Sequence, residues 1–222
     1  KYWPSMTQIL LIRHGETAWN AVRRLQGHLD IPLNTEGRRQ AKALASALEG
    51  EALAAIFSSD LQRAVQTAGE IARLQGLPTR LDPQLRERCF GDFEGKLYSE
   101  LPEIYPVEYA QWRERDPDFH FPAKSDAPNN RGESIREFHH RTIESLRHYA
   151  EQFESKTIAI VAHGGVLECA YREAMQLPLN AERSITIYNA SINRFHYHEG
   201  RLSLINWGER GHLEVGALDE VV

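Results

Sequence analysis

Three nearly continuous apolar runs constrain the fold of this chain more than any other feature. They span residues 8–12 (QILLI), 54–59 (AAIFSS) and 157–163 (TIAIVAH). Strands buried on both faces of a parallel sheet have this pattern, whereas strands with one exposed face alternate apolar and polar residues. A fourth run, 184–198, alternates more and leads through a Glu-Gly pair to residues 201–207. These two segments predict an antiparallel hairpin at the edge of the sheet.

Helical patterns separate the runs. One follows Thr35 and a second follows Asp60, and we expect these two side chains to cap their helices. A third pattern follows Ser134, which we also expect to cap its helix, and a fourth runs from Gly165 to Met175. This alternation of strands and helices favours an α/β fold, a three-layer α/β/α sandwich with a mostly parallel central sheet and an edge hairpin.

The segment 88–131 departs from this alternation. It contains five prolines and many aromatic residues, with one helical pattern at 108–115. Because it is too aromatic for a disordered linker, we expect a helical cap insertion folded over the sheet. We therefore expect a single domain over residues 6–222, with residues 1–5 as an upstream extension or a remnant of cloning.

Composition and charge limit the classes of function. The chain has 222 residues and a net charge of -5 at pH 7, which gives no general attraction to nucleic acid or to an anionic membrane. No apolar stretch approaches the ~20 residues of a membrane helix, and the first residues lack the apolar segment of a signal peptide. The two cysteines, Cys89 and Cys169, lie far apart, so we expect no disulfide and a cytoplasmic protein.

Polar functional groups follow each of the three apolar runs. The first run ends at Arg13-His14, the third ends at His163, and Arg63 follows the second run by a few residues. Ligands of open α/β sheets bind beyond the carboxyl ends of the strands, so we expect these side chains to meet at one edge. Glu87 adds a carboxyl group from a nearby connection.

This set of side chains fits phosphoryl transfer through a phosphohistidine. Two guanidinium groups can hold a tetrahedral phosphate, and a neutral imidazole is a nucleophile near neutral pH. A second imidazole can donate hydrogen bonds to the phosphate oxygens, and a carboxylic acid can protonate the leaving oxygen. The chemistry needs no metal ion, and we expect neither a metal site nor another cofactor.

Four motifs, in this order, resemble those of the histidine phosphatase superfamily, also called the phosphoglycerate-mutase-like family. They are LIRHGETAWN (11–20), FSSDLQRAVQTA (57–68), LRERCFGDFEG (85–95) and VAHGGV (161–166). The resemblance implies that His14 is the nucleophile and that Glu87 is the proton donor. It further implies that Arg13, Arg63 and His163 complete the phosphate pocket. The remaining substrate-binding residues that it implies are Asn20, Gln26, Gly27 and Gly164.

Within this family the sequence favours a phosphomonoester hydrolase acting on a small phosphorylated metabolite. Mutases of the family carry a longer insertion with paired arginines before a proline-rich stretch, and a tyrosine where this chain has Phe90. Segment 95–131 contains no such arginine pair. Phosphoglycerate mutase is the alternative, and a non-catalytic phosphate-binding regulatory module is disfavoured because all five catalytic positions are intact.

We expect the cations of the cap insertion to be solvated surface charges, and contact with a charged group elsewhere on the substrate is the alternative. The candidates are Arg88, Arg113, Arg115 and Lys124, with His28 on the other side of the site. We expect neither nucleic acid nor a membrane as partner. The hairpin at 184–207 offers an edge that either pairs in a homodimer or is covered by another part of the same chain.

Overall fold

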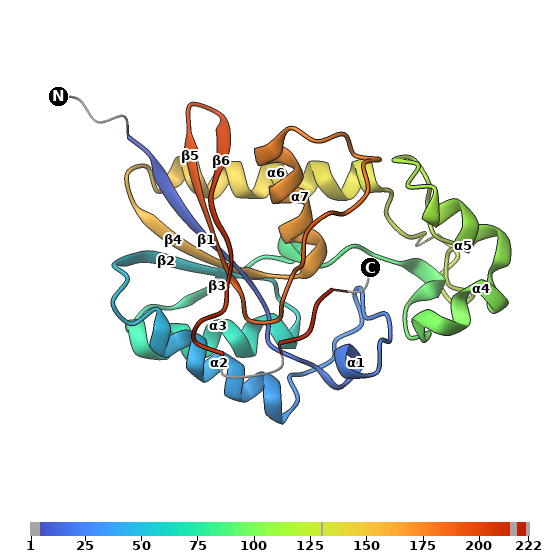
Figure 1. Ribbon diagram of the computed structural model, residues 1–222, viewed down its shortest axis with the longest axis horizontal. Helices are drawn as coiled ribbons and strands as arrows, with labels where there is room; N and C mark the ends of the chain where they lie inside the picture. The colour runs from blue at the N-terminus through green and yellow to red at the C-terminus, as the bar shows by residue number, and fades with distance from the viewer. Residues whose placement is uncertain (1–4, 130, 214–216, 221–222) are drawn as a thin grey trace.

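The computed structural model describes residues 5–129, 131–213 and 217–220 and contains a six-stranded sheet in the order β3-β2-β4-β1-β5-β6 (Figure 1). The parallel strands are β1 (Thr7–Arg13), β2 (Leu53–Ser58), β3 (Thr79–Leu81) and β4 (Thr157–Ala162). Strand β5 (Ile192–His198) is antiparallel to β1, and β6 (Arg201–Glu209) is antiparallel to β5. The expected mixed, mostly parallel sheet with an edge hairpin is confirmed.

Helices cover both faces of this sheet, which explains why residues 9–12 of β1 are all apolar. Leu10 and Ile12 belong to the apolar cluster under α2 (Thr35–Ala47) and α3 (Gln62–Gln75). Ile9 and Leu11 point the other way, into the cluster under α6 (Ile135–Gln152) and α7 (Gly164–Met175). All four side chains are completely buried. Alternate residues of one strand therefore belong to two different cores.

Two expected helix caps are wrong, and a third is confirmed. Asn34, not Thr35, caps α2, because its side chain accepts a hydrogen bond from the Gly37 N–H at 2.8 Å. Asp60 does not cap α3, since both of its carboxylate oxygens accept from Arg86 at 2.6 Å. Ser134 caps α6 in a reciprocal capping box.

The fourth apolar run forms a strand only over its second half. Its first half, 184–191, leaves the sheet because its backbone contacts the end of β1. The Ala190 N–H donates to the Arg13 carbonyl at 3.0 Å, and the Asn189 side chain donates to the His14 carbonyl at 3.1 Å. The short edge strand β3 was not expected, and its residues are partly exposed.

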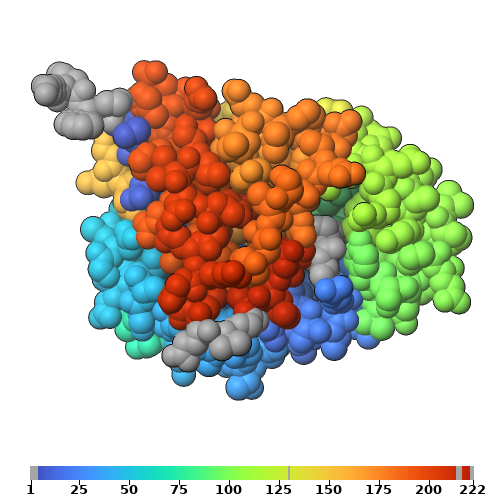
Figure 2. All heavy atoms as spheres, viewed as in Figure 1, coloured from blue at the N-terminus to red at the C-terminus, as the bar shows by residue number. Residues whose placement is uncertain are grey.

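The segment 88–131 folds around an apolar cluster separate from the two cores of the sheet. It contains η2 (Gly91–Phe93), η3 (Tyr98–Glu100), α4 (Leu101–Ile104) and α5 (Pro106–Arg113). The buried members of the cluster are Leu25, Phe90, Phe93, Leu101, Trp112 and Phe121. This segment forms a lobe at one side of the molecule (Figure 2).

Two short elements lie in the loops beside the sheet, α1 (Ala18–Ala21) and η1 (Pro83–Leu85). In the part of the chain that the structure describes, no helix is both long and apolar enough to cross a membrane. The same residues contain no group of three or more His, Cys, Asp or Glu side chains placed to hold a metal ion.

Two glycines let the loop after His14 cross the start of α2. A Cβ at Gly37 would lie 2.0 Å from the Glu16 carbonyl oxygen, and a Cβ at Gly15 would lie 2.6 Å from the Gly37 carbonyl oxygen. Both distances are far below van der Waals contact, so the loop holds its position only while these side chains are absent.

We predict that Gly37→Ala lowers the free energy of unfolding by about 2 kcal/mol, because the added methyl overpacks rigid backbone. Urea denaturation measures the effect. The control is Gly69→Ala in α3, where a Cβ meets nothing within 4 Å. That substitution should leave stability unchanged or raise it by up to about 1 kcal/mol. Equal stability of the Gly37→Ala variant and the natural protein would contradict the close approach.

Candidate active site

The carboxyl ends of β1 and β4 bring His14 and His163 together. These strands are neighbours, and Arg13 at the end of β1 is in register with Ala162 at the end of β4. The residues that follow are therefore adjacent, with their imidazole centroids 5.2 Å apart and their planes inclined at 59°. Both rings are buried.

The imidazole of His14 is held in one tautomer. Its Nδ1 lies 2.6 Å from the Gly15 carbonyl oxygen, which can only accept a hydrogen bond. The proton is therefore on Nδ1, and Nε2 carries a free lone pair. Burial, reinforced by the charges of Arg63 and Arg13, lowers the pKa of His14 well below its ordinary value. A neutral imidazole with an available lone pair is a competent nucleophile.

Arg13 is completely buried beside this ring. Its Nη1 donates to the carbonyl oxygens of Ile187 at 2.5 Å and Leu218 at 3.0 Å, which fix the plane of the guanidinium. Within the described residues its Nε has no hydrogen-bond partner, and its Nη2 forms an ion pair with Glu220. The group therefore retains donors for an anion.

Arg63 reaches the same place from the first turn of α3. Its two terminal nitrogens donate to the carbonyl oxygens of Gly27 at 2.7 Å and Leu29 at 2.8 Å. Burial lowers the pKa of Arg63 to about 10, so the side chain still carries its charge at neutral pH. Its Nε, like that of Arg13, is buried without a partner among the described residues.

His163 is positioned by a hydroxyl group for which the sequence suggested no role. Its Nε2 lies 2.8 Å from Ser59 Oγ, at the end of β2, and its Nδ1 is buried without a partner in the described part of the chain. Burial and the charge of Arg63 lower the pKa of His163 well below its ordinary value, so the ring is neutral. In the tautomer in which the Ser59 hydroxyl donates to Nε2, the ring proton is on Nδ1, where it can donate to a bound anion.

Glu87 is a buried carboxyl group. Its oxygens accept from the backbone N–H groups of Arg88 at 2.8 Å and Gly165 at 3.0 Å. Burial, followed by the charge of Glu220, raises the pKa of Glu87 to about 7 and outweighs these N–H groups. The group can therefore give up and recover a proton near neutral pH, as a general acid and base must.

Two cavities meet at Glu87 and Glu220. The smaller cavity is lined by His14 and Arg63 and by the predicted residues Asn20, Gln26 and Gly27. Gly164 lines neither cavity. A Cβ at Gly164 would lie 2.1 Å from Glu220 Oε2, so this glycine makes room for a carboxylate.

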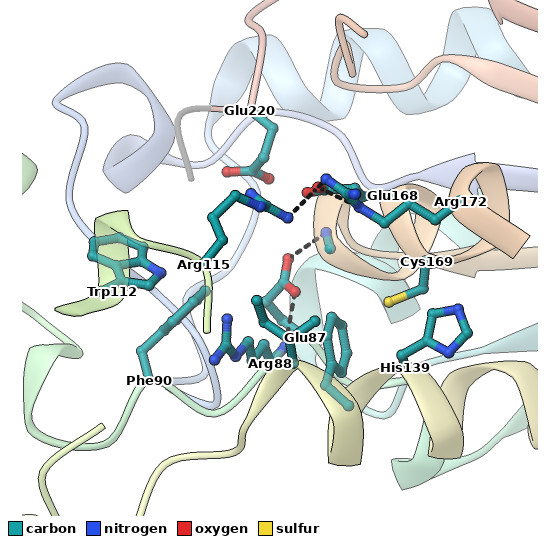
Figure 3. A pocket seen from close by; sticks show the side chains of 13 residues that line it. Glu87, Arg88, Phe90, Trp112, Arg115, His139, Glu168, Cys169, Arg172 and Glu220 are labelled. Carbon is teal, nitrogen blue, oxygen red and sulfur yellow. Dashed lines mark hydrogen bonds and ion pairs between the residues drawn. The ribbon is translucent and has the colours of Figure 1, made fainter. Parts of the chain in front are cut away.

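The larger cavity is lined by aromatic side chains and by three arginines, Arg88, Arg115 and Arg172 (Figure 3). Its wall includes Phe90, Trp112 and Phe138, and Arg88 and Arg115 face it from the cap. Arg88 Nη2 and Arg115 Nε are buried without hydrogen-bond partners among the described residues. This cavity therefore offers both apolar and cationic contacts.

The other cations considered for a distal charge lie elsewhere. Arg113 donates to the Tyr98 hydroxyl at 3.2 Å, and Lys124 pairs with Glu94 at 2.8 Å. His28 Nε2 lies 2.8 Å from the Glu87 carbonyl oxygen and supports the loop that carries the acid.

Glu220, like Ser59, is a site residue that the sequence did not indicate. Its carboxylate lines both cavities, and its Oε2 lies 3.2 Å from Arg13 Nη2. No local pattern indicated it, because the residue lies outside the four motifs and beyond the last predicted strand. Only the long-range fold brings it to Arg13.

Known proteins are similar to this chain in sequence. A family model described as "Histidine phosphatase superfamily (branch 1)" matches residues 9–210. A protein of Yersinia pestis named probable phosphoglycerate mutase GpmB is 36% identical over 221 residues, covering 97% of this chain and 99% of that protein.

Two solved structures are similar over nearly their whole length. YhfR of Bacillus stearothermophilus has a TM-score of 0.82 and 31% identity, covering 94% of this chain and 100% of that one. Phosphoserine phosphatase of Entamoeba histolytica, in complex with 3-phosphoglyceric acid, has a TM-score of 0.80 and 28% identity. That match covers 93% of this chain and 99% of the other.

The raised pKa of Glu87 makes a prediction about stability. The pKa is about 7 in the folded protein against an ordinary 4.5, so the fold favours the protonated carboxyl. Stability is therefore lost as pH rises from about 5 to about 8, by about 2 kcal/mol, and Glu87→Gln should abolish this loss. Urea unfolding of the natural protein and of Glu87→Gln across this pH range gives the difference between their free energies of unfolding. The histidine titrations are common to both proteins and cancel in this difference. A difference that does not vary with pH would show that the carboxyl titrates normally.

Proposed function

The chain belongs to branch 1 of the histidine phosphatase superfamily, and we propose that it hydrolyses phosphomonoesters of small metabolites through a phosphohistidine at His14. The observation that carries the proposal is the state of this imidazole. It is neutral, its Nε2 lone pair is available, and two buried guanidinium groups lie beside it. A tetrahedral anion fits such a pocket, and the nucleophile is already deprotonated when the anion binds.

In the first step, Nε2 of His14 attacks the phosphorus of the bound ester, and a P–N bond forms as the P–O bond to the alcohol breaks. Protonated Glu87 gives its proton to the leaving oxygen. Arg13, Arg63 and the Nδ1–H of His163 stabilise the charge on the three equatorial oxygens. The step leaves a phosphohistidine, a free alcohol and a carboxylate at Glu87.

In the second step, water attacks the phosphorus and the P–N bond breaks. The Glu87 carboxylate accepts a proton from the water, which restores the acid for the next cycle. The bonding electrons return to Nε2 of His14, and inorganic phosphate leaves.

The larger cavity is a suitable site for the leaving alcohol. It begins at Glu87, where the ester oxygen must lie to receive a proton. The free N–H groups of Arg88 and Arg115 suit an alcohol that carries a second anionic group, such as a carboxylate. The phosphoserine phosphatase of Entamoeba histolytica, whose structure contains 3-phosphoglyceric acid, supports a substrate of this size.

Phosphoglycerate mutase activity is the second candidate, because the Yersinia relative carries that name. A mutase must hold the dephosphorylated product and exclude water while the phosphoryl group returns to another hydroxyl. Phe90 and the absence of an arginine pair from 95–131 favour hydrolysis. Supplying 3-phosphoglycerate with a bisphosphoglycerate primer separates the two. Phosphate release faster than isomerisation supports the phosphatase, and the reverse supports the mutase.

We predict that His14→Ala lowers the rate of p-nitrophenyl phosphate hydrolysis by at least about 1000-fold, because no other group replaces the nucleophile. The matched control is His140→Ala, which removes an exposed imidazole of α6 and should leave the rate unchanged. Hydrolysis by the His14→Ala variant at the natural rate would refute the assignment.

We predict that Glu87→Gln separates substrates by their leaving groups. Alkyl phosphates need a proton at the leaving oxygen, so their kcat/KM should fall by about 100-fold or more. The p-nitrophenolate ion leaves without one, so p-nitrophenyl phosphate should lose less than about 10-fold. Equal losses for both kinds of ester would mean that Glu87 does not act as the acid.

A further inference from the structure

The carboxylate of Glu220 lies where a substrate phosphate would meet Arg13. Its Oε2 is 3.2 Å from Arg13 Nη2, and the guanidinium is completely buried. The same oxygen lies against Gly164, where a Cβ would come within 2.1 Å of it. In the view of Figure 3, Glu220 lies above Glu87, with Arg88 and Phe90 below. The carboxylate thus lies between the two cavities that the proposed function assigns to phosphate and leaving group.

The backbone around Glu220 is held by a series of hydrogen bonds to the segment that follows α7. The Asn189 N–H donates to the Leu218 carbonyl at 2.9 Å, and the Glu220 N–H donates to the Ile187 carbonyl at 3.0 Å. The Ile187 N–H donates to the Asp219 carboxylate at 2.7 Å. This pairing aims the Glu220 side chain at Arg13.

Arg183 adds a side-chain contact to this segment. Its Nη2 donates to the Glu220 carbonyl at 2.5 Å and lies 3.3 Å from the Asp219 carboxylate. Because Arg183 touches neither cavity beside Glu87, it acts on the position of Glu220 without contributing to the phosphate pocket.

The charges explain why a carboxylate is stable at this point. A buried guanidinium without an anion is costly, and Glu220 supplies a negative charge. Among the described residues, Glu220 is the one acidic side chain within ion-pair distance of Arg13 or Arg63. A phosphate dianion and a carboxylate repel each other when they approach the same guanidinium, so the two compete for Arg13.

We propose that Glu220 is an internal competitor for the phosphate subsite, whose carboxylate must leave Arg13 before phosphate binds. It thereby sets the affinity of the site for substrate and for product phosphate. The proposal rests on the proposed function, since it takes the cavity beside His14 as the phosphate site. Glu220 lowers the affinity for the phosphoryl group and speeds the release of inorganic phosphate.

The test is calorimetric titration with inorganic phosphate. Glu220→Gln keeps the size of the side chain and removes its charge, and its Kd for phosphate should be about 10-fold lower than that of the natural protein. KM for p-nitrophenyl phosphate should fall in parallel. The control is Glu199→Gln, which removes the same charge from an exposed side chain in the β5–β6 turn and should leave Kd unchanged.

A second variant tests the position of the carboxylate separately from its charge. Arg183→Ala keeps Glu220 but loosens the backbone that aims it, so Kd for phosphate should fall by about 3-fold. A variant with a damaged fold would bind phosphate more weakly than the natural protein. Tighter phosphate binding by both variants therefore cannot result from such damage. Unchanged or weaker phosphate binding by Glu220→Gln, relative to Glu199→Gln, overturns the proposal.

The titration also separates this proposal from the function on which it rests. If natural protein, Glu199→Gln and Glu220→Gln bind phosphate equally well, the phosphate site stands and competition by Glu220 is wrong. If none of them binds phosphate, the phosphate site itself is wrong, and the proposal fails with it.

Discussion

Two buried guanidinium groups at the carboxyl edge of the sheet are the constraint on which the rest of the site depends. Arg13 and Arg63 lie out of contact with water, and their charges are compensated by backbone carbonyl oxygens from distant loops, with Glu220 as the acidic partner of Arg13. The loops must therefore follow paths that aim carbonyl groups at these cations. Burial, reinforced by the same charges, lowers the pKa of His14 and keeps its imidazole neutral. In the proposed function, this one arrangement of buried charge prepares both the anion pocket and its nucleophile.

Glu87 lines both the cavity beside His14 and the larger cavity, so its position sets the side of the site on which the leaving alcohol would lie. Because burial and a neighbouring carboxylate raise its pKa to about 7, the same group can protonate a leaving oxygen and later accept a proton from water. A bound phosphate dianion would replace Glu220 as the negative neighbour, so the acid stays protonated when substrate exchanges with the internal carboxylate. In the proposed function, the leaving alcohol is selected on the other side of Glu87, where Arg88, Arg115 and the aromatic residues of the cap line the larger cavity.

The sequence predicted those features that depend on local order along the chain. Apolar runs followed at once by Arg13-His14 or His163 indicate parallel strands that end at a ligand, because carboxyl ends of such strands share an edge. Features that depend on distant partners were not predictable. Asp60 lies between a strand and a helix, where a helix cap is expected. Both of its carboxylate oxygens nevertheless accept hydrogen bonds from Arg86. Residues 184–191 have a strand-like pattern, but they instead wrap the end of β1 and hold Glu220.

The central claim is that the phosphoryl group passes through the His14 imidazole. The most direct measurement mixes the protein with a radiolabelled phosphomonoester and quenches it in alkali within a single turnover, since phosphohistidine is labile in acid. Digestion should then place the label on the peptide that contains His14, rising and decaying as product phosphate appears. Turnover at the full rate with no label on that peptide, or with label on another side chain, would contradict the account.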